Sequence, residues 1–373
     1  MVSHKNIKVL HLTTHLNIGG ITSYLRLTGA ALVRAGHSVS VLSGGGELAD
    51  DFTRAGVTLY EFPIRTKKEL HPKIYRHLIR IISLVKKERF DVLHAHTRVT
   101  QLLGTLVSRA SGVPMVTTAH GFFRPHIGRL LVKGWGERVI AISPLVAESL
   151  EESHRVDPDR IRIIPNAIDI ADSQKRLAVH DPAGIRFEFG IPKDALVLSS
   201  ISRLVADKGH GYLIQAVKLL KDRGRGVYLV ILGDGRERDN LNRLADSLGV
   251  RDCVKIIPFE KDITKVLAVT DIFVHPATYR EGFGLVIAEA MVAGKPVLAT
   301  DIPAINTLVE DRVTGRMVKP KDAAALAAAV MEMADRAADT RALAEAGRQK
   351  ALGVCSLDRM VESLVEVYRE VAR

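Results

Sequence analysis

Short runs of β-branched residues alternate with amphipathic segments of helix length from the first residues onward, and no other feature constrains the fold as strongly. In the first half of the chain this pattern predicts strands at Lys8–Thr14, Ser38–Ser43, Val57–Ile64, Asp91–His96, Met115–His120, Arg138–Ser143 and Ile161–Pro165. It predicts helices at Thr22–Ala35, Pro72–Arg89 and Val99–Ala110, and another that opens at Ser143-Pro144. Alternation of this kind is typical of a parallel sheet covered by helices on both faces.

The same alternation begins again after a polar stretch of weak periodicity, residues 166–192. Predicted strands are Leu196–Ser202, Tyr228–Leu232, Val254–Ile257, Ile272–His275 and Val297–Ala299, and predicted helices are Gly211–Lys221, Glu237–Leu248, Ile263–Val269, Gly284–Ala293, Ala323–Ala334 and Leu357–Val371. A chain of 373 residues is longer than one hydrophobic core usually supports. We therefore expect an α/β protein with two doubly wound, Rossmann-like domains, 1–165 and 193–356, connected by a linker at 166–192 and facing each other across a cleft.

Composition excludes several classes of protein. With 47% hydrophobic and 25% charged residues, the chain is neither disordered nor a membrane bundle. Its two cysteines, Cys253 and Cys355, form no CxxC or Cys/His cluster, which argues against a disulfide framework and a thiolate zinc site. No apolar run reaches the roughly 20 residues that span a bilayer, and the first residues lack a secretion signal. We expect a cytoplasmic protein.

The net charge of +11 is concentrated in the first half of the chain. Residues 1–186 contain 26 Lys and Arg against 16 Asp and Glu, whereas residues 187–373 contain 27 against 26. A basic field suits nucleic acid, anionic lipid or a phosphorylated substrate, and charge alone does not choose between them. Only 5% of the residues are aromatic and no nucleic-acid-binding motif is present, which argues against a nucleic-acid partner.

The segment Asp271–Val297, DIFVHPATYREGFGLVIAEAMVAGKPV, is the most informative about chemistry. A buried strand is expected to end before a loop, and a helix to begin near Gly284. Gly282, Phe283 and Gly284 then place unpaired backbone N–H groups at the helix N-terminus, where two of the three residues have no Cβ. This arrangement predicts a site for a phosphate or for a ligand rich in hydroxyl groups.

Two carboxylates flank the start of that helix. Glu281 stands just before it, and Glu289 lies within it beside apolar residues that include Leu285. Carboxylates accept pairs of hydrogen bonds, which suits the diols of a sugar or a ribose. The alternative is that Glu281 caps the helix electrostatically and Glu289 faces solvent. The apolar neighbours of Glu289 argue for a partner, because a buried carboxylate needs one.

Two cations follow a strand of the same predicted sheet. Arg203 and Lys208 lie in the sequence SRLVADKG, directly after the strand at Leu196–Ser202. At the carboxyl end of a strand they would stabilise the charge of a leaving diphosphate. The alternative is a solvated turn with one Arg–Asp pair. Gly233, in the turn Gly-Asp-Gly after another strand, is a weaker candidate for lining a nucleotide pocket.

The first domain contributes weaker signals. Gly19 and Gly20 lie between the first strand and its helix, where glycines let backbone amides reach a phosphate, although no GxGxxG motif is present. His120 ends a predicted strand, so its imidazole is expected to face the cleft. A structural role is the alternative for this histidine.

Candidate metal ligands are few. Asp157-Pro158-Asp159 has the DxD form used by metal-dependent sugar transferases, but it lies where Asp is an ordinary turn residue. His94 and His96 share one face of a strand. With no third clustered ligand, we interpret these two histidines as structural rather than as zinc ligands.

Taken together, these motifs resemble the retaining GT-B glycosyltransferases of family four, also called glycosyl transferases group one, over nearly the whole chain. The resemblance is found at Gly19-Gly20, TTAHG (Thr117–Gly121), IIPNAID (Ile163–Asp169), ISRLVADKG (Ile201–Gly209), LGDG (Leu232–Gly235) and, most specifically, the two glutamates of EGFGLVIAE. It implies that the C-terminal domain binds a nucleotide sugar, the N-terminal domain binds the acceptor, and the last helix, 357–373, crosses back onto the first domain.

The resemblance also implies a role for each candidate residue. Glu289 would hold the ribose, while Glu281 and the amides of Gly282–Gly284 would hold the donor sugar. Arg203 and Lys208 would neutralise the diphosphate in place of a divalent metal, so no metal cofactor is expected. His120 would border the donor sugar, Gly19-Gly20 would close over the phosphates, and the product would keep the anomeric configuration of the donor. The segment Asp301–Gly315 lacks the Gly-Gly and Pro-Glu pairs of the family, which leaves the sugar unassigned.

The acceptor is less well defined than the donor. The segment Pro72–Arg89 places Ile74, Leu78, Ile81, Ile82 and Val85 on one helix face and Lys73, Arg76, Arg80 and Lys87 on another. We hypothesise that this basic stripe contacts an anionic membrane surface at the inner face of the plasma membrane, consistent with a lipid-linked or envelope-glycan acceptor. The alternative is a sheet-covering helix with a solvated face. At the level of the reaction, the alternative is a sugar-nucleotide epimerase or phosphorylase on the same fold.

Overall fold

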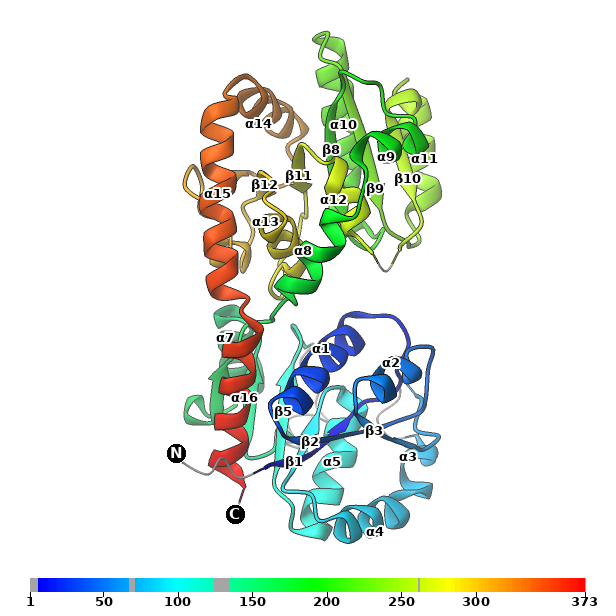
Figure 1. The fold of residues 1–373 in the computed structure, drawn as a ribbon, viewed down its shortest axis with the longest axis vertical. Helices are drawn as coiled ribbons and strands as arrows, with labels where there is room; N and C mark the ends of the chain where they lie inside the picture. The colour runs from blue at the N-terminus through cyan, green and yellow to red at the C-terminus, as the bar shows by residue number, and fades with distance from the viewer. Residues whose placement is uncertain (1–5, 67–70, 124–133, 261, 373) are drawn as a thin grey trace. The chain divides into compact units, whose positions relative to one another are not determined.

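The computed structural model describes residues 6–66, 71–123, 134–260 and 262–372, and the chain divides into two compact units. The first unit is residues 1–167 together with 357–373, and the second is residues 168–356. Helices lie on both faces of the sheet in each unit (Figure 1). Each unit is described by itself below.

The first unit contains a parallel sheet of seven strands in the order β3-β2-β1-β4-β5-β6-β7. Its strands are β1 (Lys8–Leu12), β2 (Ser38–Ser43), β3 (Thr58–Glu61), β4 (Val92–Ala95), β5 (Met115–Ala119), β6 (Arg138–Ala141) and β7 (Ile161–Ile163). Its helices are α1 (Gly20–Arg34), α2 (Ala49–Arg54), α3 (Pro72–Arg76), α4 (Leu78–Glu88), α5 (Arg98–Ser111), α7 (Pro144–His154) and α16 (Leu357–Val371). The central strands β4 and β5 are buried from end to end, and β1 is buried after its first residue, as expected for a sheet that is covered on both faces.

The predicted helix Pro72–Arg89 is divided in two by His77. At this residue the backbone has φ −104° and ψ 2°, outside the helical range, and the ring of His77 packs edge-on against Phe62 at 6.0 Å between centroids. The contact with the chain after β3 coincides with the break. Ile74, Ile81 and Val85 of the predicted apolar face are buried in the core of the unit, while the side chain of Lys73 lies outside the described residues.

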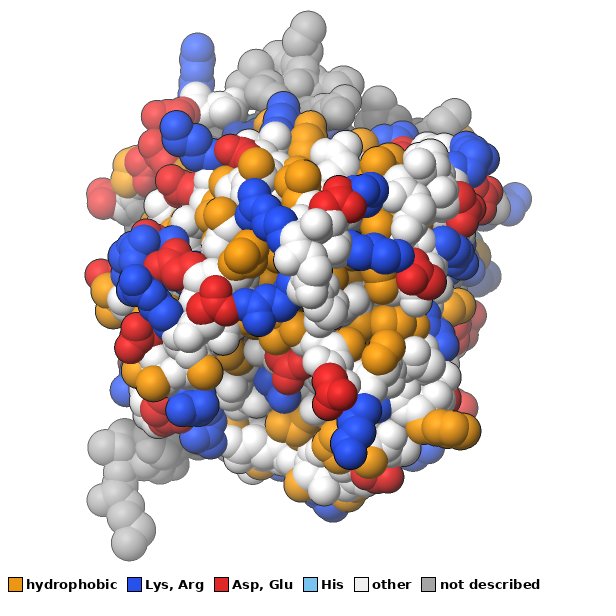
Figure 2. Space-filling model, turned by 90° about the horizontal axis from the view of Figure 1, so that it is seen from above, with side chains coloured by type: hydrophobic (Ala, Val, Ile, Leu, Met, Phe, Trp, Pro, Cys, Tyr) orange, Lys and Arg blue, Asp and Glu red, His pale blue; other side chains and the backbone are white. Residues whose placement is uncertain are grey.

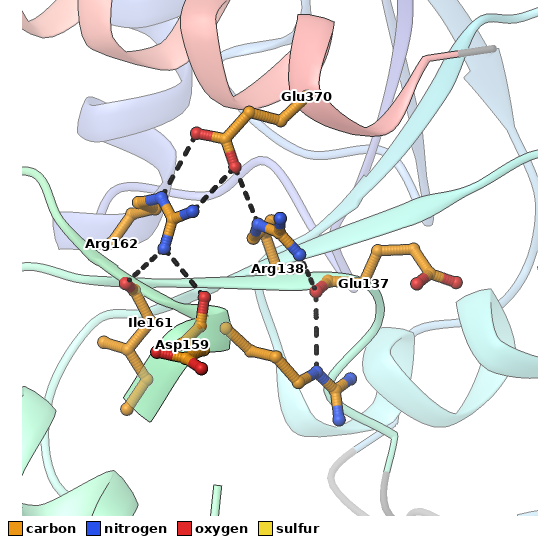
Figure 3. Close-up of polar contacts among 7 residues, drawn as sticks. Glu137, Arg138, Asp159, Ile161, Arg162 and Glu370 are labelled. Carbon is orange, nitrogen blue, oxygen red and sulfur yellow. Dashed lines mark hydrogen bonds and ion pairs between the residues drawn. The ribbon is translucent and has the colours of Figure 1, made fainter. Parts of the chain in front are cut away.

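Helix α16 is the last element of the chain and yet packs on the first unit, against α1 (Figure 1). Met360, Leu364, Val367 and Tyr368 are buried in the same core as the residues of α1. At the helix end, Glu370 bridges two neighbouring strands: Arg138 Nε lies 2.7 Å from Oε2 and Arg162 Nη2 lies 2.9 Å from the same oxygen (Figure 3). These hydrogen bonds lower the pKa of Glu370, and the one from Arg162 has the largest effect.

The second unit contains a parallel sheet of six strands in the order β10-β9-β8-β11-β12-β13. The strands are β8 (Leu196–Ile201), β9 (Val227–Leu232), β10 (Val254–Ile257), β11 (Ile272–His275), β12 (Val297–Thr300) and β13 (Arg316–Val318). The helices are α8 (Ile170–Ala178), α9 (Pro182–Phe189), α10 (His210–Asp222), α11 (Arg238–Ser247), α12 (Thr264–Val269), α13 (Leu285–Val292), α14 (Ala323–Asp335) and α15 (Ala337–Val354). Four of these elements, α8, α9, α15 and β13, were not expected from the sequence.

The prediction that residues 166–192 form a linker is wrong, because most of this stretch folds as α8 and α9. Both helices have an aspartate at the N-cap, Asp169 and Asp181, whose side chains accept hydrogen bonds from backbone N–H groups of the first turn. Both pack against α12 of the second unit. The polar composition that suggested a linker is that of short surface helices with capping residues.

The surface of the molecule mixes charges of both signs. On the face seen in Figure 2, Lys and Arg side chains are interspersed with Asp and Glu, and hydrophobic side chains are scattered between them. No helix in the described part of the chain combines the length and hydropathy that a membrane span requires.

Candidate functional site

The strand order of the second unit creates a point where loops diverge. After β8 the chain moves to β9 and β10 on one side of β8, and it then returns to β11 on the other side. The loops that leave the carboxyl ends of β8 and β11 therefore turn to opposite faces of the sheet. In open α/β sheets, ligands bind at such a switch point.

The two loops at this switch point are bonded to each other. The backbone N–H of Thr278, after β11, donates to the carbonyl of Asp207, after β8, at 2.8 Å. Gly209 has φ +69°, and a Cβ at this position would lie 1.9 Å from the carbonyl oxygen of Pro276. Only glycine fits where the loops approach so closely, and the sequence SRLVADKG is thereby fixed against the segment that contains Glu281.

This contact brings two of the predicted site residues together. Lys208 forms an ion pair with Oε1 of Glu281, and the two side chains are only 14% and 16% exposed. His275, the last residue of β11, places Nε2 3.2 Å from the same oxygen. Burial alone would raise the pKa of Glu281, but the hydrogen bond from His275 and the charges of His275 and Lys208 lower it to about 2. Glu281 is therefore a carboxylate throughout the neutral range.

Arg203 differs from Lys208 because it has no ion-pair partner among the described residues. It lies in the same loop after β8 and is exposed, and its guanidinium makes no hydrogen bond or ion pair with the described residues. An exposed cation that is not itself paired can accept an anionic ligand from solvent at little desolvation cost.

The segment from Gly282 to Gly284 leads into α13. Gly284 is the N-cap residue with φ +85°, and no side chain caps the helix. Within the described residues, the backbone N–H groups of Gly282, Phe283 and Gly284 donate to no acceptor, whereas the N–H of Glu281 reaches the carbonyl of Pro303 at 3.5 Å. The ring of Phe283 is buried, so this residue offers only its backbone to a ligand. Leu285, the first residue of α13, is half-buried.

Glu289 lies in α13, two turns after Glu281. It is half-buried, and burial raises its pKa to about 7, an effect that the charge of Arg176 in α8 partly offsets. Its charge in turn adds to burial in raising the pKa of Cys355 to about 12. Glu289 is thus a carboxyl group poised between its two protonation states at neutral pH.

The turn at Gly233 is constrained by packing. A Cβ on Gly233 would lie 1.9 Å from the carbonyl oxygen of Ser202, and one on Gly235 would lie 2.2 Å from that of Leu204. Asp234 between them accepts hydrogen bonds from Arg238 at 2.8 Å and from the N–H of Phe259 at 2.8 Å. The close approach of Gly233 and Gly235 to the loop after β8 is sufficient reason for both glycines.

The first unit has its own switch point, between β1 and β4, and histidines gather there. Nδ1 of His11 lies 2.9 Å from Nε2 of His96, and Nδ1 of His96 lies 3.1 Å from Nε2 of His120. His94 pairs instead with the hydroxyls of Tyr368 and Thr118, each at 2.7 Å. Burial lowers the pKa of His11 and of His120 to about 3 and lowers those of His94 and His96 as well. All four imidazoles are neutral at pH 7.

A pocket of about 440 Å³ adjoins these histidines within the first unit. Its lining includes His96, His120, Thr14, Ile21, Phe122 and Phe123. His120, which follows β5, is half-buried at this wall. Gly19 and Gly20 are exposed at the start of α1, and a Cβ on either would meet no atom within 4 Å, so packing does not require glycine there.

The structure changes one premise about metal binding. His94 and His96 were predicted to lack a third clustered partner, but His11 supplies it: one ligand atom from each of the three lies within 4.8 Å of the others. His11 and His94 are direct neighbours in the register of β1 and β4. Their ring nitrogens already bond to one another and to Tyr368 and Thr118, so hydrogen bonding accounts for most of the cluster without an ion. In the DxD sequence, Asp157 accepts a hydrogen bond from the N–H of Asp159 at 3.0 Å, as a turn residue does.

Two residues of these sites were missed in the sequence, His275 and His11. His275 is the last residue of a predicted strand, so the reasoning that singled out His120 applies to it equally. His11 had no such signal, because its partners are 83 and 85 residues away and only the strand order brings them together.

Comparison with known proteins gives a consistent result. The family model "Glycosyl transferases group 1" matches residues 183–350, and "Glycosyltransferase Family 4" matches residues 18–172. The chain is 28% identical to a D-inositol 3-phosphate glycosyltransferase of Actinosynnema mirum, over 94% of this chain and 92% of that protein. It is 24% identical to the UDP-Gal:alpha-D-GlcNAc-diphosphoundecaprenol alpha-1,3-galactosyltransferase of Escherichia coli, over 89% of each chain. Among solved structures, Anabaena Alr3699/HepE in complex with UDP-glucose has a TM-score of 0.83 and 22% identity, over 98% of this chain and 100% of that one.

Proposed function

The chain belongs to the group 1 glycosyltransferases and has their GT-B fold, and we propose that it transfers a hexose or N-acetylhexosamine from a nucleoside diphosphate to a hydroxyl acceptor with retention of anomeric configuration. We take UDP as the first nucleotide to test, because HepE was solved with UDP-glucose and the Escherichia coli relative is named for a UDP-sugar. The single observation that carries the proposal is the β8/β11 switch point, where Lys208, Glu281 and the unpaired amides of Gly282–Gly284 meet.

Each side chain at this switch point suits one part of such a donor. In this proposal Arg203 and Lys208 neutralise the diphosphate as the glycosidic bond breaks, which is the role that a divalent metal has in DxD enzymes. Glu281 and the amides after it suit the hydroxyl groups of the sugar, and Glu289 suits the ribose diol. The resemblance to the family assigns His120 and Gly19-Gly20 of the first unit to the donor sugar and its phosphates, and these assignments remain predictions.

The donor class is tested by thermal shift with a panel of nucleotide sugars, because a ligand that binds only the folded state raises the melting temperature. We expect at least one UDP-sugar to stabilise the chain and to be consumed only when an acceptor is present. Turnover without acceptor would indicate an epimerase, and dependence on inorganic phosphate a phosphorylase. Activity should persist after dialysis against a chelator; loss that magnesium or zinc restores would contradict the metal-free proposal.

For the acceptor we propose a lipid-linked or envelope glycan, with the enzyme in the cytoplasm and associated peripherally with the membrane. The support is local: Ile79 of α4 is 82% exposed, between the exposed cations Arg76 and Arg80. An exposed apolar side chain among basic ones favours an anionic lipid surface. Liposome flotation tests this: we expect the chain to float with anionic vesicles at low salt and Ile79→Ser to float less. Absence of the wild-type chain from anionic vesicles would exclude the contact.

A further inference from the structure

We propose that His275 is a positioning residue that divides the two oxygens of Glu281 between the protein and the donor sugar. It holds Oε1 from the strand side and so leaves Oε2 free to accept hydrogen bonds from sugar hydroxyls. This inference rests on the proposed function, since it assumes that the sugar of the donor binds at Glu281.

The contacts of Glu281 are strongly asymmetric. Both of its partners, Lys208 and His275, bond to Oε1. Within the described residues, Oε2 accepts no hydrogen bond, while the side chain keeps 16% of its surface exposed. A carboxylate oxygen can accept about two hydrogen bonds, so the protein occupies one oxygen fully and leaves the other for a ligand.

The chemistry of the contact fixes the proton on His275. Glu281 is ionised and can only accept, so the hydrogen bond at 3.2 Å requires that Nε2 of His275 carry a proton. His275 is itself 4% exposed, at the end of a buried strand, and Thr300 of the adjacent β12 donates to its backbone carbonyl at 3.3 Å. The imidazole that donates this hydrogen bond is therefore held in place by the sheet, and the contact does not depend on a flexible side chain.

The second partner of Glu281 has a competing task. Lys208 lies at the loop where the diphosphate is expected, and an ammonium group that turns toward phosphate gives less of its charge to Glu281. A largely buried carboxylate without a partner is unfavourable. Because His275 keeps its hydrogen bond to Oε1, Glu281 can stay in place and ionised while Lys208 also serves the phosphate.

This division of contacts separates the sugar from the nucleotide in a binding experiment. UDP alone needs Lys208 and Arg203 but not Oε2 of Glu281, whereas a UDP-sugar needs both. Loss of the His275 hydrogen bond should therefore leave the affinity for UDP unchanged and reduce the extra affinity that the sugar provides. We expect a reduction of roughly tenfold to a hundredfold, the range for a hydrogen bond to a charged group.

The experiment is calorimetry of the full chain with UDP and with the UDP-sugar selected by thermal shift, on wild type, His275→Leu and His275→Gln. Leu removes the donor, whereas the amide of Gln supplies an N–H near the position of Nε2, so His275→Gln should recover most of the sugar-dependent affinity. His210→Gln is the matched control, because His210 is also buried and near the site but bonds to Ser202 at 2.8 Å. With saturating acceptor, His275→Leu should raise the KM for the UDP-sugar more than it lowers kcat.

Equal sugar-dependent affinity in wild type and His275→Leu would overturn the inference and leave the proposed function intact. Loss of UDP affinity in His275→Leu to the same extent as UDP-sugar affinity would also overturn it, because the residue would then support the loop as a whole. If His275→Leu does not fold, His275→Gln and the shorter His275→Asn decide: the inference requires that Gln retain the sugar-dependent affinity and Asn lose it. A wild-type chain that binds neither UDP nor any UDP-sugar, and no other nucleotide sugar, would instead overturn the proposed function and this inference with it.

Discussion

Each of the two sheets has a topological switch point, but the side chains at one switch point are charged and those at the other are neutral. At the β8/β11 switch point of the second unit lie an ionised glutamate, a lysine and an exposed arginine. At the β1/β4 switch point of the first unit lie four imidazoles that burial keeps neutral. Fold alone thus does not determine the chemistry of a switch point. The charged point suits the diphosphate of a nucleotide sugar, and the neutral one suits hydroxyl groups.

The largest effect that this comparison predicts follows from removing the cations of the charged switch point. Arg203→Ala combined with Lys208→Ala should lower kcat by roughly a hundredfold to a thousandfold and donor affinity by much less, because the charge to be stabilised grows as the diphosphate leaves. Steady-state kinetics with donor and acceptor varied measure both quantities.

The matched control is Lys221→Ala combined with Arg225→Ala, which removes two cations from the same unit. These cations pair with Asp252 and Asp335 on the surface. It should leave kcat unchanged, since surface pairs contribute little. A similar loss of kcat in both double variants would show that net charge, and not this switch point, matters.

How far the sequence predicts these two sites depends on how locally each is encoded. Lys208 and Glu281 belong to loops that follow strands recognisable by their β-branched runs, so the parallel sheet places both at one edge. Their proximity also needs β8 and β11 to be neighbours, which only the structure shows. Helix α15 was missed because its buried positions, Thr340, Ala344, Gly347 and Ala351, are small and give almost no hydrophobic period. The histidine cluster was missed as a unit because His11 pairs with residues more than eighty positions away, and periodicity along one segment holds no information about register between strands.

A smaller effect is expected from the neutral histidines when the pH falls. Unfolded histidines titrate near pH 6.5, whereas His11 has a folded-state pKa of about 3 because of burial. The contribution of such a histidine to the free energy of unfolding is therefore fully present above pH 6.5 and decreases as the pH falls toward 3. Between pH 7 and 5 the decrease is about 2 kcal/mol per such histidine. The only tryptophan, Trp135, lies in the first unit, so its fluorescence reports unfolding of this unit in urea.

His11→Gln sharpens that measurement. The variant should be less stable than wild type at pH 7, because His96 loses a hydrogen-bond partner. Its stability should also depend less on pH between 7 and 5, since one group that the unfolded chain protonates is gone. An unchanged slope would mean that His11 takes up a proton in the folded unit, and the neutral character of this switch point would be wrong.

The smallest effect concerns Glu289 and has the opposite sign. Its folded-state pKa of about 7 lies above the value near 4.5 expected for the unfolded chain, so the folded unit binds the proton more tightly. Ionisation therefore costs stability progressively between pH 4.5 and 7, and the full cost is present above pH 7. Because Glu289 is half-buried, we expect this cost to be about 1 to 2 kcal/mol.

Glu289→Gln should thus be more stable than wild type at pH 8 and equal to it at pH 5, as measured by hydrogen exchange of the amides in β11 and α13. Glu345→Gln, on the exposed face of α15, should show no difference at either pH. If Glu289→Gln were instead less stable at pH 8, the folded unit would have to stabilise the carboxylate, and the second unit would then lose stability as the pH falls, as the first unit does.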